Sequence, residues 1–116
     1  MKELIIYHNP RCSKSRQTLE LLTDRGIEPE IVLYLEDIPS VEALKGLLSK
    51  LGISARELLR KGESVYKENN LKDTSLSDVQ IIQAMVDYPK LIERPIVVKG
   101  DKAVLGRPPE NVLNLI

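Results

Sequence analysis

The sequence of 116 residues has few aromatic side chains and no excess of charge. It contains four tyrosines but neither phenylalanine nor tryptophan, so its core must be built mainly from Leu, Ile and Val. Basic and acidic residues balance at 17 each, giving a formal net charge of zero. This balance argues against nonspecific nucleic-acid binding, which depends on a strongly positive face.

Cysteine and histidine are also scarce, with Cys12 and His8 the single examples of each. One cysteine cannot form an internal disulfide, which favours a reducing compartment, and we expect a cytoplasmic protein. One histidine and one cysteine cannot fill a zinc site, so we expect no metal. We also expect no bound cofactor. No apolar run approaches the roughly 20 residues of a membrane span, and the N-terminus lacks a signal-peptide pattern. We therefore expect a soluble protein, and we expect it to be a monomer.

The first third of the chain predicts a strand, a helix and a second strand. Leu4–Tyr7 is a short apolar run that ends at a turn. A helical pattern follows over Ser13–Arg25, and Glu30–Leu35 is again strand-like. A βαβ unit of this length predicts that the two strands are parallel.

The middle of the chain predicts helices, and two of them begin with a Ser-x-x-Glu/Gln capping box. The expected helices run from Ser40 to near Gly52, from Ser54 through Arg60-Lys61 to Gly62, from Ser64 to Asn69, and from Ser77 to near Tyr88-Pro89.

The last part predicts a β-hairpin and a helix. Pro95–Val98 and Lys102–Leu105 flank a Gly-Asp turn, and Gly106-Arg107-Pro108-Pro109 is a good helix start. A βαβ half followed by a ββα half is the thioredoxin-like α/β plan. We therefore predict a mixed four-stranded sheet with an inserted helical segment, in a single domain over residues 1–116.

Cys12 lies where the first strand ends and the first helix begins. A helix N-terminus offers unpaired amides and partial positive charge, which favour both a thiolate and a bound anion. Arg11, Lys14 and Arg16 add positive charge, and Ser15 can donate a hydrogen bond to sulfur or to an oxyanion. The alternative is that Cys12 is a small buried residue, as many free cysteines are. The local pattern leaves both interpretations open.

His8 has two interpretations as well: support of a Cys12 thiolate, or a hydrogen-bonded turn histidine. A Cys–His pair alone lacks the orienting partner of a cysteine protease. Phosphatase-type loops place an arginine six positions after the nucleophile, and residue 18 here is Thr.

Three arginines stand at element boundaries: Arg60 near a helix end, Arg94 before Pro95, and Arg107 before Pro108. Arginine presents a planar fork of donors that suits oxyanions, although each of these alone also fits a solvated surface position. In a thioredoxin-like fold the proline before the third strand is usually cis and faces the thiol, which makes Pro95 a cis-proline candidate.

The stretches "YHNPRCSKSRQTLELL", "ISARELLRK", "ERPIVV" and "GRPPE", in this order, resemble the glutaredoxin-linked arsenate reductase (ArsC) family, above all its short proteobacterial members. The resemblance covers nearly the whole chain. It implies a thioredoxin-like fold and reduction of arsenate to arsenite. Its nucleophile falls on Cys12 and its thiolate-supporting histidine on His8. Its substrate-binding groups fall on Arg60, Arg94, Arg107 and the loop that contains Ser15 and Arg16.

The implied partners are arsenate, glutathione as co-substrate, and glutaredoxin. One thiol cannot by itself supply two electrons and return as a disulfide, so the reductant must be external. Two other functions fit the same sequence: a glutathione-dependent thiol oxidoreductase acting on another oxyanion or thiol, and a non-enzymatic redox or transcription-partner protein. Regulators of the latter kind typically carry Cys-x-x-Cys, whereas Ser15 occupies the second position here.

Overall fold

The computed structural model describes residues 4–116, and these residues form two compact units. The first unit combines the described residues up to Asp37 with the segment Arg94–Ile116. The second is the continuous segment Ile38–Glu93.

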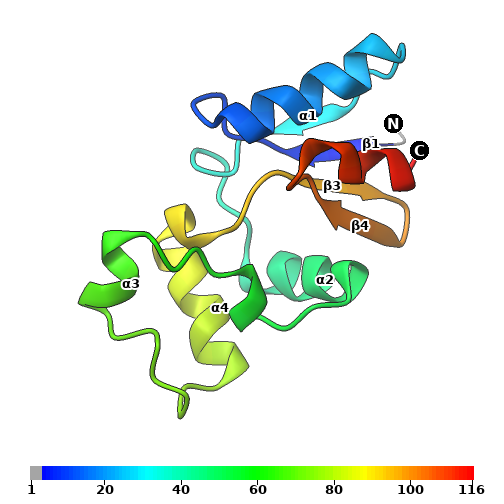
Figure 1. Ribbon diagram of the computed structural model, residues 1–116. Helices are drawn as coiled ribbons and strands as arrows, with labels where there is room; N and C mark the ends of the chain where they lie inside the picture. The colour runs from blue at the N-terminus through cyan, green and yellow to red at the C-terminus, as the bar shows by residue number, and fades with distance from the viewer. Residues whose placement is uncertain (1–3) are drawn as a thin grey trace. The chain divides into compact units, whose positions relative to one another are not determined.

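The first unit is built on a mixed four-stranded sheet of order β2-β1-β3-β4 (Figure 1). The strands are β1 (Leu4–Tyr7), β2 (Glu30–Val32), β3 (Ile96–Lys99) and β4 (Lys102–Leu105). β1 pairs with β2 in parallel and with β3 antiparallel, and β3 and β4 form an antiparallel hairpin. The predicted mixed sheet and its parallel βαβ unit are confirmed.

One face of this sheet is covered by α1 (Ser13–Asp24) and the 3₁₀ helix η3 (Pro109–Asn114), which pack against each other. Alternate strand residues point to the same face, and Ile6 lies opposite Val97 in the β1–β3 register. The core under the helices consists of the buried residues Leu4, Ile6, Leu22, Val97 and Val112. This packing fixes the N-terminus of α1 at the end of β1.

The second unit is helical, and its α2 (Val41–Leu51) packs against α4 (Asp78–Asp87). Between them in the chain lie η1 (Arg56–Leu58) and α3 (Ser64–Glu68), and η2 (Pro89–Leu91) follows α4. None of the helices in the described part of the chain has the length and apolar character needed to cross a membrane.

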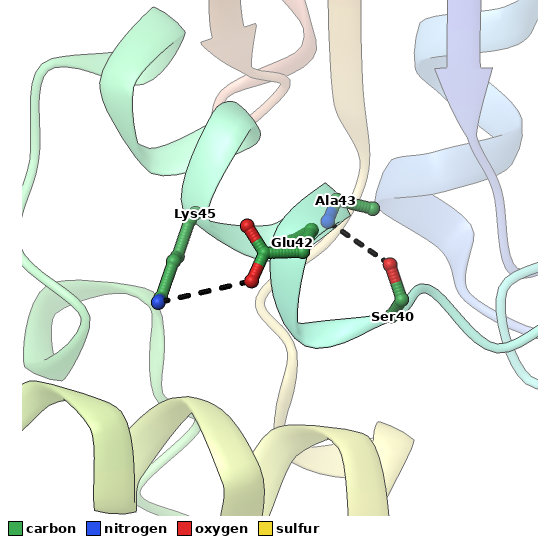
Figure 2. Close-up of polar contacts among 4 residues, drawn as sticks. All are labelled: Ser40, Glu42, Ala43 and Lys45. Atoms are coloured by element: carbon green, nitrogen blue, oxygen red, sulfur yellow. Dashed lines mark hydrogen bonds and ion pairs between the residues drawn. The ribbon is translucent and has the colours of Figure 1, made fainter.

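The helix starts follow the capping rules. Ser40 accepts a hydrogen bond from the Ala43 amide at 3.1 Å at the start of α2 (Figure 2). Gly52 ends that helix in the left-handed conformation. The Glu42–Lys45 ion pair in the same view is 3.9 Å long and exposed, so it contributes little stability. Ser77 and Gln80 form the predicted capping box of α4.

Three predicted elements differ from the observed ones. The expected helix from Ser54 to Gly62 is only the short 3₁₀ helix η1. Leu59 is extended and pairs with Ile92, and Arg60 N–H donates to the Leu91 carbonyl at 2.8 Å. These long-range backbone bonds replace the helical ones.

The two other differences are local. β2 ends at Val32 rather than Leu35, because the Leu33 carbonyl accepts hydrogen bonds from the amides of Glu36 and Asp37 and forms a turn. The last helix is of the 3₁₀ type and begins at Pro109.

Candidate active site

The loop between β1 and α1 is ordered by Asn9. The Asn9 carbonyl accepts a hydrogen bond from Cys12 N–H at 3.0 Å, and its side-chain Oδ1 accepts one from Arg11 N–H at 3.0 Å. Asn9 is buried, so both oxygens are held in place from within the unit. The loop therefore delivers Cys12 to the helix start in a fixed orientation.

Cys12 is the N-cap residue of α1 and has an extended backbone. Its carbonyl accepts the Arg16 N–H at 3.0 Å, which begins the helical bonding. The side chain is partly exposed, in contrast to a residue that only fills the core. A thiol in this position can reach a ligand and faces the unpaired amides of the first helical turn.

The environment of Cys12 lowers its thiol pKa below the ordinary value. Burial acts in the opposite direction and raises the pKa, but it is outweighed by hydrogen bonding from the Ser15 backbone N–H and by the charge and hydrogen bonding of Arg94. The Lys14 backbone N–H contributes in the same sense. A larger fraction of Cys12 is thus thiolate, the nucleophilic form, near neutral pH.

His8 and Ser15 form a buried polar pair behind this loop. His8 Nδ1 lies 2.6 Å from Ser15 Oγ, and the Asn9 N–H donates to the same oxygen at 3.0 Å. Burial, followed by the charge of Arg16, lowers the pKa of His8. The ring is therefore favoured as neutral imidazole, which orients Ser15, rather than as an imidazolium beside the sulfur.

Arg16 stabilises the loop that carries Cys12. Its Nη1 donates to the Pro10 carbonyl at 2.9 Å, so the guanidinium closes the loop around Cys12. Arg16 is an exposed side chain, and its charge remains at the same end of α1 as the thiol.

Arg94 and Arg107 reach the same region from the other half of the unit. The Arg94–Pro95 and Arg107–Pro108 peptide bonds are both cis, the second of which the sequence did not single out. Arg107 Nη1 lies 3.5 Å from the Arg94 carbonyl. The structure thus brings two of the three predicted arginines together, and Arg94 acts directly on the thiol of Cys12.

Arg60 belongs to the second unit, as does its ion-pair partner Glu93. Its Nη1 lies 3.5 Å from Glu93 Oε1, as an ion pair without hydrogen-bond geometry. Both side chains are about one quarter exposed. Arg60 is therefore a partly buried cation held at the end of the Leu58–Arg60 segment.

Two residues that support the site were missed by the sequence analysis, Thr18 and Gly106. A side chain on Gly106 would place its Cβ 2.5 Å from Thr18 Oγ1 and 2.8 Å from Pro95 Cγ. Gly106 N–H also donates to the Pro95 carbonyl at 2.9 Å, and Thr18 is fully buried. A glycine before Arg-Pro-Pro suggests a turn, but no local pattern reports a contact 88 residues away along the chain.

The first unit therefore holds a partly exposed thiol of lowered pKa, backbone N–H groups that face it, and a guanidinium beside it. Backbone amides and arginines stabilise negative charge on an oxyanion and on the sulfur alike. This arrangement can carry out nucleophilic attack by a thiolate on the central atom of an oxyanion.

The comparisons with known proteins all point to the same family. A model of the ArsC family matches residues 7–115. The uncharacterized protein YfgD of Escherichia coli (strain K12) is 60% identical over 116 residues, covering 99% of this chain and 98% of that protein. A Haemophilus influenzae protein named arsenate reductase is 49% identical over 114 residues, with 97% and 98% covered. The solved structure of arsenate reductase from Vibrio cholerae has a TM-score of 0.97 at 52% identity, with 99% and 98% covered.

Proposed function

Because the chain belongs to the ArsC family, we propose that it is an oxidoreductase that reduces arsenate to arsenite, with Cys12 as the nucleophile. The observation that carries the proposal is the position of Cys12 at the N-terminus of α1, with its pKa lowered by backbone N–H groups and Arg94. The names of the relatives support arsenate as the substrate, and the geometry of the site supports attack by a thiolate.

In the first step the Cys12 thiolate attacks arsenic. A sulfur–arsenic bond forms and an arsenic–oxygen bond breaks, and the oxygen leaves as water after protonation. The proposed anion-binding groups are Arg60, Arg94 and Arg107 together with Ser15 and Arg16 of the loop. Donors fixed in advance stabilise the negative charge without reorganisation during the reaction. Neutral His8 contributes by holding Ser15 in place.

In the second step two external thiols supply the electrons. Glutathione replaces a second oxygen on arsenic and forms a sulfur–arsenic bond. The glutaredoxin thiolate then attacks the glutathione sulfur, which produces a mixed disulfide and leaves the bonding pair on arsenic. Arsenic(V) thereby becomes arsenic(III), and water displaces arsenite from Cys12. Arsenate and two thiols give arsenite, one disulfide and water, so atoms and electrons balance.

External thiols are required because Cys12 is the only cysteine. The scheme uses no resident cofactor, and it places the protein in the cytoplasm, where glutathione keeps thiols reduced. The nucleophile and all the proposed anion-binding residues come from one chain, so the scheme requires only a monomer.

The test is turnover of the purified protein with arsenate, glutathione and glutaredoxin, coupled to NADPH oxidation. We expect activity that Cys12→Ser abolishes and that Ser49→Ala, an exposed change on α2, leaves intact. Wild-type activity at the Cys12→Ser level across a wide range of arsenate would overturn the proposal. Running the same assay with other oxyanions and with disulfide substrates identifies the alternative thiol oxidoreductase.

A further inference from the structure

A cavity of about 240 Å³ lies beside the Cys12 loop, within the first unit. It is open to solvent on one side and is lined by the loops that follow β1 and β2, which lie side by side in Figure 1. These loops meet because the two strands are parallel and the His8 N–H donates to the Val32 carbonyl at 2.9 Å. In open α/β sheets, ligands bind beyond the carboxyl ends of such strands.

The walls of this cavity combine apolar surface with one charge of each sign. Pro10, Leu33 and Leu35 supply the apolar part, and Leu35 is 37% exposed although it is a large aliphatic residue. Arg11 and Glu36 supply the charges. Both are exposed, and neither forms an ion pair with another residue in the described part of the chain. The cavity therefore presents a cation and an anion on separate loops.

We propose that this cavity binds the charged glutamyl end of glutathione, with its carboxylate on Arg11 and its ammonium on Glu36. The inference rests on the proposed function, which needs a thiol peptide as co-substrate. A guanidinium suits a carboxylate because it can donate two parallel hydrogen bonds. Glu36 provides the acceptor that an ammonium requires.

The volume of the cavity suits one end of a tripeptide rather than the whole peptide. Pockets that enclose a whole small ligand are typically about 300–1,000 Å³, so 240 Å³ accommodates one end of a tripeptide and leaves the remainder at the surface. Arg11 directly precedes Cys12 in the chain. A peptide anchored at Arg11 is therefore held on the loop that carries the nucleophile, and we infer that the part left at the surface extends toward Cys12.

Binding is measured with S-methylglutathione, which cannot react with sulfur or arsenic, in an NMR titration of the wild-type protein without arsenate. We expect shifts in the backbone amides of residues 8–12 and 33–37. Arg11→Gln and Glu36→Gln should each weaken binding about two- to fivefold, the range for exposed ion pairs. Arg25→Gln and Glu20→Gln are matched controls, because both residues are exposed and lie on α1 or at its far end.

The Glu36→Gln variant is the more decisive test. The direction in which it changes the binding affinity distinguishes a direct contact from the general electrostatic effect of the carboxylate. Glutathione carries a net negative charge, so removing a nearby carboxylate without any contact would strengthen its binding. A Glu36–ammonium contact requires the opposite, weaker binding. An S-methylglutathione analogue that lacks the ammonium should bind Glu36→Gln at least as well as it binds wild type.

Unchanged or tighter binding of S-methylglutathione to Glu36→Gln overturns this inference, as do amide shifts confined to other parts of the chain. These results leave the proposed function standing if arsenate turnover persists. Peptide binding at the cavity with no arsenate turnover has the opposite meaning: the proposed function fails and the cavity remains a peptide site. In the active enzyme, Glu36→Gln should raise KM for glutathione and leave KM for arsenate unchanged.

Discussion

The thiolate of Cys12 is favoured by two kinds of group, backbone N–H groups and one guanidinium, and these respond differently to substitution. Arg94→Gln removes the charge beside the sulfur and keeps the backbone donors of Ser15 and Lys14. We therefore expect the pKa of Cys12 to rise. Since the thiolate is the reactive species, the pH profile of Cys12 alkylation by iodoacetamide should move to higher pH.

Alkylation can be assigned to a single site by mass spectrometry, because Cys12 is the only cysteine. Lys14→Gln is the control: it removes a nearby side-chain charge and keeps the backbone N–H that acts on the thiol. An alkylation profile of Arg94→Gln that coincides with wild type would show that Arg94 does not act on the sulfur.

Ser15 is the structural centre of the loop as well as a proposed substrate contact. Ser15→Ala removes the partner of His8 Nδ1 and of the Asn9 N–H, and all three groups are buried. Leaving buried polar groups unpaired costs about 1–3 kcal/mol. We expect a loss of this size in the free energy of unfolding, measured by urea denaturation.

Ser49→Ala should change that free energy by less than about 0.5 kcal/mol, because Ser49 is exposed. If Ser15→Ala proved as stable as this control, the His8–Ser15 pair would carry no structural role. The sequence predicts this pair only in part. The spacing placed His8, Cys12 and Ser15 in one loop, but the sequence did not show that the ring bonds to Ser15 and is buried.

At the scale of the secondary-structure elements, α1 packs closely against the residues that precede β3 and follow β4. This close packing is possible because Gly106 has no side chain. Gly106→Ala would force its Cβ against Thr18 and Pro95, at 2.5 Å and 2.8 Å. Overpacking of this kind typically costs about 1–3 kcal/mol. We expect such a loss in urea denaturation, together with a shift in the Cys12 alkylation profile, because Arg94 directly precedes Pro95.

Gly46→Ala is the matched control and should have the opposite sign. Gly46 lies in the interior of α2 and nothing is within 4 Å of its Cβ position, so Ala should stabilise the helix by about 0.5–1 kcal/mol. Adding Thr18→Ala should recover part of the stability lost in Gly106→Ala, since the two changes share one contact. Equal stability of Gly106→Ala and wild type would contradict the packing described.

Elements with local signals were predictable, and elements set by distant partners were not. The Ser77–Gln80 box marks α4, and Gly52 marks the end of α2, because caps are made within one helical turn. Ser54 carries the same kind of signal, and its hydroxyl contacts Glu57, yet the helix stops after Leu58. Pairing of Leu59 with Ile92 overrides the local preference, and that pairing is invisible to a local pattern.

On the scale of the whole molecule, the formal net charge is zero, with 17 basic and 17 acidic residues. An anionic substrate is therefore not attracted by the overall charge, and under the proposed function the affinity for arsenate must come from particular donors. The sequence could nominate those donors by position and resemblance. It could not show that Arg94 acts on Cys12 or that Arg60 is paired with Glu93, because both contacts depend on side-chain placement.

Under the proposed function, replacing one binding arginine and replacing an ordinary surface lysine change the net charge equally and should differ in effect. Arg60→Gln, Arg94→Gln and Arg107→Gln should each raise KM for arsenate about tenfold or more, the consequence of losing a hydrogen bond to a charged group. Lys61→Gln, next to Arg60 and exposed, should leave KM near the wild-type value. Steady-state kinetics at constant ionic strength, with unfolding free energies measured in parallel, separates binding from stability. A KM for Arg60→Gln equal to that of Lys61→Gln would remove Arg60 from the arsenate site, and equal values for all four variants would show that arsenate is held by other groups.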